Sequence, residues 1–141
     1  MFNKLLVPVD VADVDAAKPA LDRAVAMANA SDGTLRLIYV RSILPVTYME
    51  FVPPSFDDEQ QRDSERKLAE IAAGIALPRD RVSAVVRLGS VYNEVLDEAK
   101  KIGADLIIVG SHRPTMATYL LGSNASTIVR HAESSVLVVR A

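Results

Sequence analysis

ADLIIVGS, at residues 104–111, is a short run of aliphatic, mostly branched side chains that ends at a glycine and a serine. Its length and composition are typical of a strand buried in a parallel sheet. Downstream, apolar residues recur at helical spacing, at Leu121, Ala125, Ile128 and Ala132. A strand and a helix joined through Gly-Ser pairs at 110–111 and 122–123 predict an α/β unit with an anion-binding loop between them.

The same alternation of strand and helix extends through the whole chain. Strands are predicted at residues 4–10, 34–40, 82–87, 105–109 and 135–140, and a long proline-containing connection at 41–56. Since parallel crossovers are right-handed, an open doubly wound five-stranded parallel sheet of order 3-2-1-4-5, with helices on both faces, is the leading fold. The 141 residues fit one domain, 1–141.

The helices are predicted from apolar stripes and terminal residues. Leu68 and Ile71 belong to the core stripe of a helix over 57–74, and Ser90 is predicted to cap the helix that begins at Val91. Glu94 and Glu98 are four residues apart, which is ordinary spacing for an exposed helix face. We therefore expect both carboxylates at the surface.

Composition excludes several classes of protein. The net charge is −2 and the basic residues are scattered, which argues against a nucleic-acid or membrane partner held by bulk electrostatics. There is no cysteine, so the chain has neither disulfides nor thiol chemistry. No apolar run approaches the roughly 20 residues that span a bilayer, and no leader precedes the first strand. A cytoplasmic protein is the expectation.

The predicted ligand site lies where the strand order reverses, between strands one and four. Asp10 ends the first strand, opposite Gly110 and Ser111. Ser123 and Asn124 begin a helix, where free backbone amides and the helix dipole favour phosphate. Neither a Walker A motif nor a G-x-G-x-x-G after strand one occurs, so a nucleotide would depend on the loop after strand four.

Several segments together are similar to the universal stress protein A family, over essentially the whole chain. They are LLVPVD at 5–10, LIYV at 37–40, RLGS at 87–90, GADLIIVGS at 103–111, LLGS at 120–123, VRHA at 129–132 and VLVV at 136–139. The resemblance is strongest to the ATP-binding branch and to the bacterial F and G members. It implies that the chain binds ATP, with any magnesium arriving on the phosphates.

The resemblance also assigns residues to parts of the nucleotide. The phosphates would lie against the amides of Gly110, Ser111 and their followers, and of Gly122, Ser123 and Asn124. The adenine would lie near Pro8, Val9 and Val40, and Asp10 would face the sugar or base. Gly89, at the end of the third predicted strand, would permit close approach of the ligand.

The loop after strand four departs from the family pattern at Arg113, which replaces a glycine and precedes Pro114. Proline restricts the residue before it to extended conformations, so the loop must take another path. Arg113 could bind phosphate by a charge-assisted hydrogen bond or point to solvent. His112 could donate to phosphate or act as an acid or base, or be an ordinary loop residue.

Three functions are compatible with these residues. The first is an ATP-binding regulatory module in a stress response, acting as a homodimer through the aliphatic edge strand Val136–Val139. The second is slow ATP hydrolysis or nucleotidyl transfer using Asp10, His112 and Arg113. The third is a nucleotide-free interaction protein whose phosphate site Arg113 and Pro114 have abolished. The first is favoured, because no triad or metal motif occurs.

Overall fold

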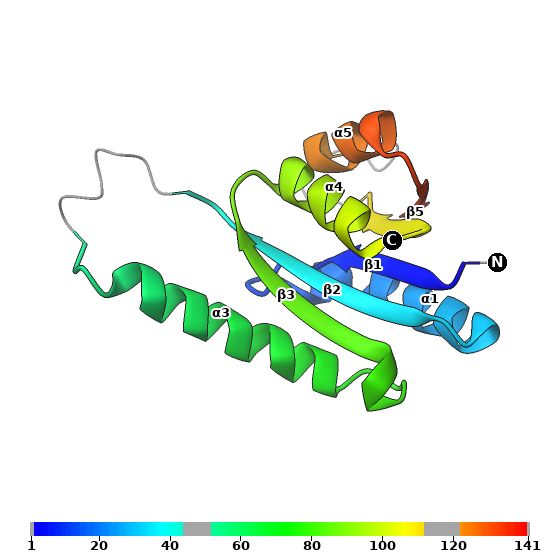
Figure 1. Cartoon of the computed structure of the whole chain (residues 1–141), viewed down its shortest axis with the longest axis horizontal. Helices are drawn as coiled ribbons and strands as arrows, with labels where there is room; N and C mark the ends of the chain where they lie inside the picture. Colours follow the sequence, from blue (N-terminus) through cyan, green and yellow to red (C-terminus); the bar gives the residue numbers. More distant parts are fainter. Residues whose placement is uncertain (1, 44–51, 112–121, 141) are drawn as a thin grey trace.

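The protein forms a twisted five-stranded parallel sheet covered by helices on both faces (Figure 1). In a computed structural model, residues 2–43, 52–111 and 122–140 are described. Their strands are β1 (Lys4–Pro8), β2 (Thr34–Arg41), β3 (Val82–Leu88), β4 (Leu106–Gly110) and β5 (Ser135–Val139). The sheet order is β3-β2-β1-β4-β5, and every adjacent pair is parallel. The predicted fold class and strand order are confirmed.

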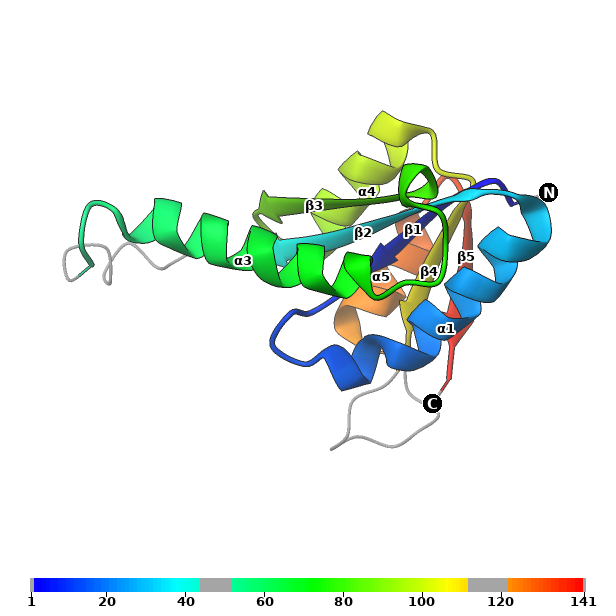
Figure 2. The same ribbon diagram turned by 90° about the horizontal axis from the view of Figure 1, so that it is seen from below.

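The helices form two layers, one on each face of the sheet. In the described ranges they are α1 (Val14–Ser31), α3 (Phe56–Ala73), α4 (Val91–Ile102) and α5 (Ser123–His131), with a short 3-10 turn, η1 (Arg79–Arg81). Helices α1 and α3 cover one face, and α4 and α5 cover the other (Figure 2). Within those ranges, no helix is long and apolar enough to cross a membrane.

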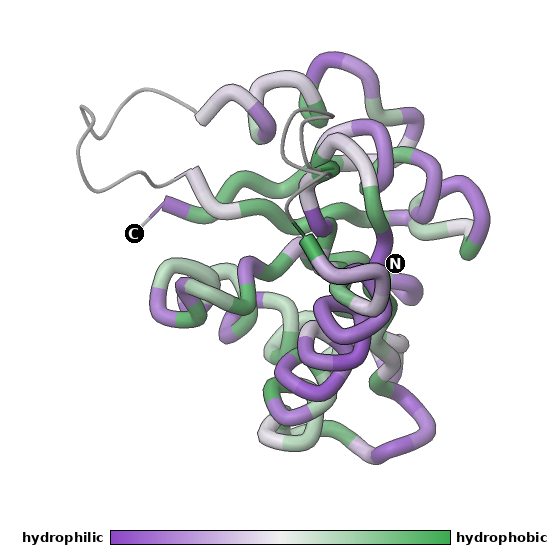
Figure 3. Tube along the Cα trace, turned by 90° about the vertical axis from the view of Figure 1, so that its left-hand side faces the viewer, coloured by the Kyte–Doolittle hydropathy of each residue, from purple (hydrophilic) through white to green (hydrophobic). Residues whose placement is uncertain are grey.

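Each face of the sheet has its own apolar core, because successive side chains of a strand point to opposite faces. Leu5 and Val7 of β1 pack in the cluster beneath α1 and α3. Leu6, between them, packs in the cluster beneath α4 and α5. Figure 3 shows that hydrophobic residues follow the strands while hydrophilic residues dominate α3. The apolar runs used to predict the strands therefore supply side chains to both cores.

The element boundaries agree with the predictions to within a few residues. Strand β1 ends at Pro8 rather than Asp10, although the Val9 N–H still donates to the Ile38 carbonyl at 2.8 Å. Ser90 is the N-cap residue of α4, but its hydroxyl makes no capping hydrogen bond. Half of the predicted 41–56 connection, residues 44–51, lies outside the described residues, and α3 begins at its last residue, Phe56.

Candidate functional site

A small cavity lies at the point where the strand order reverses. It has a volume of about 180 Å³ and is walled by the ends of β1 and β4, by α1, and by the first turns of α4 and α5. The connections after β1 and β4 lead to helices on opposite faces of the sheet, which opens a crevice at the carboxyl edge. The cavity lining is Pro8, Asp10, Asp13, Ala16, Ala17, Ala20, Val91, Val109, Gly110, Asn124, Ala125 and Ile128.

Four of the residues singled out in the sequence line this cavity. They are Pro8, Asp10, Gly110 and Asn124. They come from three separate parts of the chain, and the β1–β4 pairing of Leu5 with Leu106 brings the first and second parts together. Two larger hollows, of about 590 Å³ beside α4 and about 690 Å³ beside α3, contain none of the predicted site residues. These four predicted site residues therefore meet at the smaller cavity.

Among the described residues, Asp10 is one of two acidic residues that line the cavity. Its Oδ1 accepts a hydrogen bond from the Ala12 N–H at 2.9 Å, and its carbonyl accepts one from the Asp13 N–H at 3.1 Å. These bonds form the tight turn between β1 and α1. The side chain is exposed, and its second carboxylate oxygen takes no part in this turn. Asp10 thus shapes the loop and presents an acceptor at the cavity.

Helix α5 begins at the cavity and supplies backbone donors. Gly122 is its N-cap residue in an extended conformation, and the first helical hydrogen bond runs from the Ser126 N–H to the Gly122 carbonyl at 2.9 Å. The amides of Ser123 and Asn124 precede that bond, so they have no partner within the helix. Within the part of the chain that the structure describes, no side chain caps this end. The arrangement suits an anion at the start of the helix.

The backbone N–H of Ser111 is not available to a ligand, contrary to the prediction from the sequence. Its N–H donates to the Val139 carbonyl at 3.0 Å, which extends the β4–β5 pairing by one residue. The residue is only 5% exposed. Its amide is therefore used by the sheet, whereas Asn124 in the first turn of α5 lines the cavity. His112 and Arg113 lie outside the described residues.

Val9 directly follows β1, and Val40 lies near the end of the neighbouring strand β2. Both are buried, Val9 in the core beneath α1 and Val40 in the core beneath α4. The Val9 N–H is engaged with Ile38, so a ligand edge reaching Val9 would meet its carbonyl rather than its N–H. Val40 pairs in register with Arg87 of β3. The end of β3 is thus directly beside one predicted adenine contact.

Gly89 follows β3 in a conformation that favours glycine. Its φ is +152°, and its N–H donates to the Arg41 carbonyl at 2.9 Å. A Cβ at this position would lie 2.9 Å from Oε2 of Glu94. The glycine is required by its own backbone and by the close approach of Glu94. It does not line the cavity itself.

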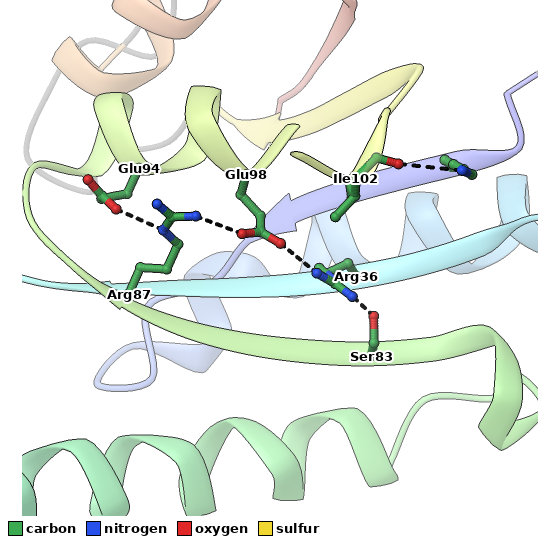
Figure 4. A network of polar contacts seen from close by, with 7 residues as sticks. Arg36, Ser83, Arg87, Glu94, Glu98 and Ile102 are labelled. Atoms are coloured by element: carbon green, nitrogen blue, oxygen red, sulfur yellow. Dashed lines mark hydrogen bonds and ion pairs between the residues drawn. The ribbon is translucent and has the colours of Figure 1, made fainter. Parts of the chain in front are cut away.

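The prediction that Glu94 and Glu98 are exposed surface residues is wrong. Glu98 is 0% exposed and accepts hydrogen bonds from Arg36 at 2.5 Å and Arg87 at 2.9 Å (Figure 4). Arg87 also donates to Oε1 of Glu94 at 2.7 Å, and Arg36 donates to the Ser83 hydroxyl at 3.0 Å. We call Arg36, Arg87, Glu94 and Glu98 the ion-pair ladder. It joins α4 to β2 and β3.

Electrostatics keep the ladder charged despite its burial. Burial raises the pKa of Glu98, but the hydrogen bonds from Arg36 and Arg87 outweigh it, and the net pKa lies below the ordinary value. Hydrogen bonds to Glu98 and Glu94 raise the pKa of Arg87. Arginines on neighbouring strands cannot be paired from sequence without the register. The one signal in the sequence is that each of two otherwise mostly apolar predicted strands contains an arginine, Arg36 and Arg87. A charged residue in such a strand suggests an acidic partner nearby.

Comparisons with known proteins agree with this architecture. The model of the Universal stress protein family matches residues 1–140. The chain is 34% identical to universal stress protein G of Shigella flexneri, over 99% of this chain and 100% of that protein. The chain belongs to the universal stress protein family. Among solved structures of this family, one in complex with cAMP has a TM-score of 0.70 at 24% identity, covering 99% of this chain and 97% of that chain.

A second solved relative extends the comparison to another nucleotide. The universal stress protein of Archaeoglobus fulgidus, in complex with dAMP, has a TM-score of 0.65 at 17% identity, covering 99% of this chain and 98% of the other. Both likenesses show the common fold. As a universal stress protein, this chain shares its architecture with proteins whose structures contain adenine nucleotides.

Proposed function

We propose that this universal stress protein binds ATP in the cavity between β1 and β4 and acts as a nucleotide-dependent regulatory module. The observation that carries the proposal is the convergence of Asp10, Gly110 and Asn124 on one cavity at the switch point. The cAMP and dAMP complexes of two structural neighbours support an adenine nucleotide as the ligand class. The residues around the cavity then indicate where the phosphates and the adenine would lie.

The phosphates belong at the α5 end of the cavity. The free amides of Ser123 and Asn124 and the helix dipole attract negative charge there, and Gly110 leaves the opposite wall without a side chain. Asp10 and Asp13 also line the cavity, and their carboxylates would repel a phosphate. We therefore assign Asp10 to the sugar, whose hydroxyls donate to a carboxylate. Any magnesium would arrive on the phosphates and reduce their charge.

The adenine belongs beyond the cavity, at the ends of β1 and β2. A volume of about 180 Å³ is below the roughly 300–1,000 Å³ of most small-molecule sites, so the cavity holds only part of ATP. The base would extend along Val9 and Val40 toward Gly89. Val9 and Val40 are buried on opposite faces of the sheet, so the base would meet the backbone at this edge, including the Val9 carbonyl, rather than their side chains.

The direct test is identification of bound nucleotide. Protein purified without added nucleotide is denatured, the supernatant is analysed by mass spectrometry, and stripped protein is titrated with ATP, ADP and GTP in a calorimeter. We expect adenine nucleotide in the supernatant and saturable binding of ATP in preference to GTP. Absence of both co-purified nucleotide and calorimetric binding would instead support the nucleotide-free interaction protein.

We further propose that the protein forms a homodimer through β5. This strand pairs only with β4 among the described strands, and Val136 to Val139 are half-buried without a second neighbour. The Val139 carbonyl accepts from Ser111, so the backbone groups of Val139 face β4 and those of Val138 face outward. An outward row of unpaired groups on an aliphatic edge favours pairing with a second copy.

Val138→Pro is expected to abolish this dimer. Proline removes the outward N–H of position 138 and spares the bonds of Val139 to β4. Sedimentation velocity at matched concentration should show a dimer for the native protein and a monomer for the variant. Leu88→Ser, at an exposed residue that ends the opposite edge strand, is the control and should remain dimeric. A dimeric Val138→Pro protein would contradict pairing through β5.

A further inference from the structure

The ion-pair ladder ends beside the adenine side of the proposed site, rather than in the middle of the core. Arg87 is the register partner of Val40, the predicted adenine contact on β2. On its other side Arg87 holds Glu94, which lies in the first turns of α4. That first turn also carries Val91, which lines the cavity. Arg87 therefore connects two walls of the site.

Glu94 is pressed against the turn that joins these walls. Its carboxylate and Cγ lie 2.9–3.1 Å from the position of a Cβ at Gly89. Gly89 in turn donates its N–H to the carbonyl of Arg41, the neighbour of Val40. A chain of contacts thus links Arg87 to Glu94, Glu94 to Gly89, and Gly89 to the end of β2. Each link is either a hydrogen bond or a close packing contact.

We propose that Glu94, held by Arg87, is a positioning residue for the adenine end of the nucleotide site. It fixes the Gly89 turn and the first turn of α4, and so sets the spacing between Val40 and Val91. The proposal rests on the nucleotide binding proposed above. A fold-stabilising role alone would be served by Glu98, whose side chain is fully buried and bound by both arginines. Glu94 adds a contact directed at the turn.

The experiment compares ligands that report on the two ends of the site. Adenosine reports on the base end and inorganic tripolyphosphate on the phosphate end. Both are titrated into native protein, Glu94→Ala, Glu94→Gln and Gly89→Ala, well below the melting temperature of each variant. We expect Glu94→Ala to weaken adenosine and ATP by about tenfold and to leave tripolyphosphate unchanged. Glu94→Gln keeps an acceptor for Arg87 and should bind adenosine nearly as the native protein does.

The double-mutant cycle of positions 89 and 94 tests the contact itself. A methyl group at position 89 pushes against Glu94, so Gly89→Ala should also weaken adenosine, and the two changes should be non-additive. Glu133→Gln, at the exposed pair with Lys100, is the matched control and should bind all ligands as the native protein does.

The possible outcomes separate this proposal from the proposed function. If native protein binds neither ATP nor adenosine, nucleotide binding itself is wrong. If native protein binds both, unchanged adenosine affinity in folded Glu94→Ala overturns the positioning role. Equal losses for adenosine and tripolyphosphate would also overturn it, because they indicate general loosening of the site. If Glu94→Ala does not fold, Gly89→Ala provides the same comparison, because its methyl group pushes against Glu94, and unchanged adenosine affinity in folded Gly89→Ala overturns the positioning role.

Discussion

Glu98→Ala is expected to lower the free energy of unfolding by about 3 kcal/mol at neutral pH. Removal of one partner from a buried ion pair typically costs about 3–5 kcal/mol, because the remaining charges stay desolvated. Glu98 is fully buried, whereas Arg36 and Arg87 keep 32% and 26% of their side-chain surface exposed. Partial hydration of the arginines places the effect at the lower end of that range. Urea unfolding at constant m-value measures it.

Glu133→Ala is the matched control for this loss. Its pair with Lys100 is 3.3 Å long, but both side chains are well exposed, at 76% and 65%. Exposed ion pairs contribute little, so the change should stay within about 0.5 kcal/mol. Similar effects of the two alanines would show that the ladder stabilises no more than a surface pair does.

The stabilisation by Glu98 should also depend on pH in a defined direction. Its pKa is lower in the folded protein than its ordinary value, so the folded state binds a proton less readily than the unfolded chain. The stabilisation is therefore complete above about pH 4.3, the ordinary glutamate value, and is lost as the pH falls through the lower folded value. The stability difference between native protein and Glu98→Gln should shrink in that acid range and stay constant above it.

Gly110→Leu is expected to weaken ATP binding by about 100-fold or more, equivalent to at least about 2.7 kcal/mol. The nearest atom to an added Cβ is the Ala16 carbonyl oxygen at 3.8 Å, an ordinary contact, so the fold should tolerate the change. Ala16 belongs to the cavity wall, and the longer side chain would therefore enter the space assigned to phosphate. Calorimetric titration with ATP, beside a circular dichroism melt, measures the two effects separately.

Two other glycine substitutions are controls for the loss of ATP binding in Gly110→Leu. Gly110→Ala adds only the tolerated Cβ and should bind ATP almost normally. Gly74→Leu, at the exposed end of α3, adds the same leucine far from the cavity and should have no effect on binding. Native affinity in folded Gly110→Leu would show that the phosphates bind elsewhere in the protein.

Local patterns were sufficient for the architecture, and they singled out residues that meet at one cavity. Branched apolar runs such as Leu106–Val109 predicted the strands. The handedness of crossovers left few possible strand orders, and the leading one is the order that the structure has. That order placed Asp10 opposite Gly110 before any coordinates were known. The structure then brought both into one cavity with Asn124.

The sequence did not predict which partners the Ser111 amide and the Glu98 carboxylate have. The Ser111 amide follows a strand and looks available, but it donates to Val139, a residue 28 positions later in the chain. Glu98 fits an exposed helix face by spacing, but it lies over Arg36 and Arg87. Both outcomes depend on the register and packing of distant segments.

The sequence by itself thus determined the element order, the two apolar layers and the edge of the sheet at which Asp10 and Gly110 meet. Those features follow from the periodicity of neighbouring residues and from backbone chirality, which act over short stretches of chain. Only the tertiary structure decided that Glu98 is a buried ladder residue, that Glu94 lies next to Gly89, and that the Ser111 amide is used by the sheet. Burial and pairing of polar groups are set by contacts between segments far apart in sequence, and such contacts leave no local pattern.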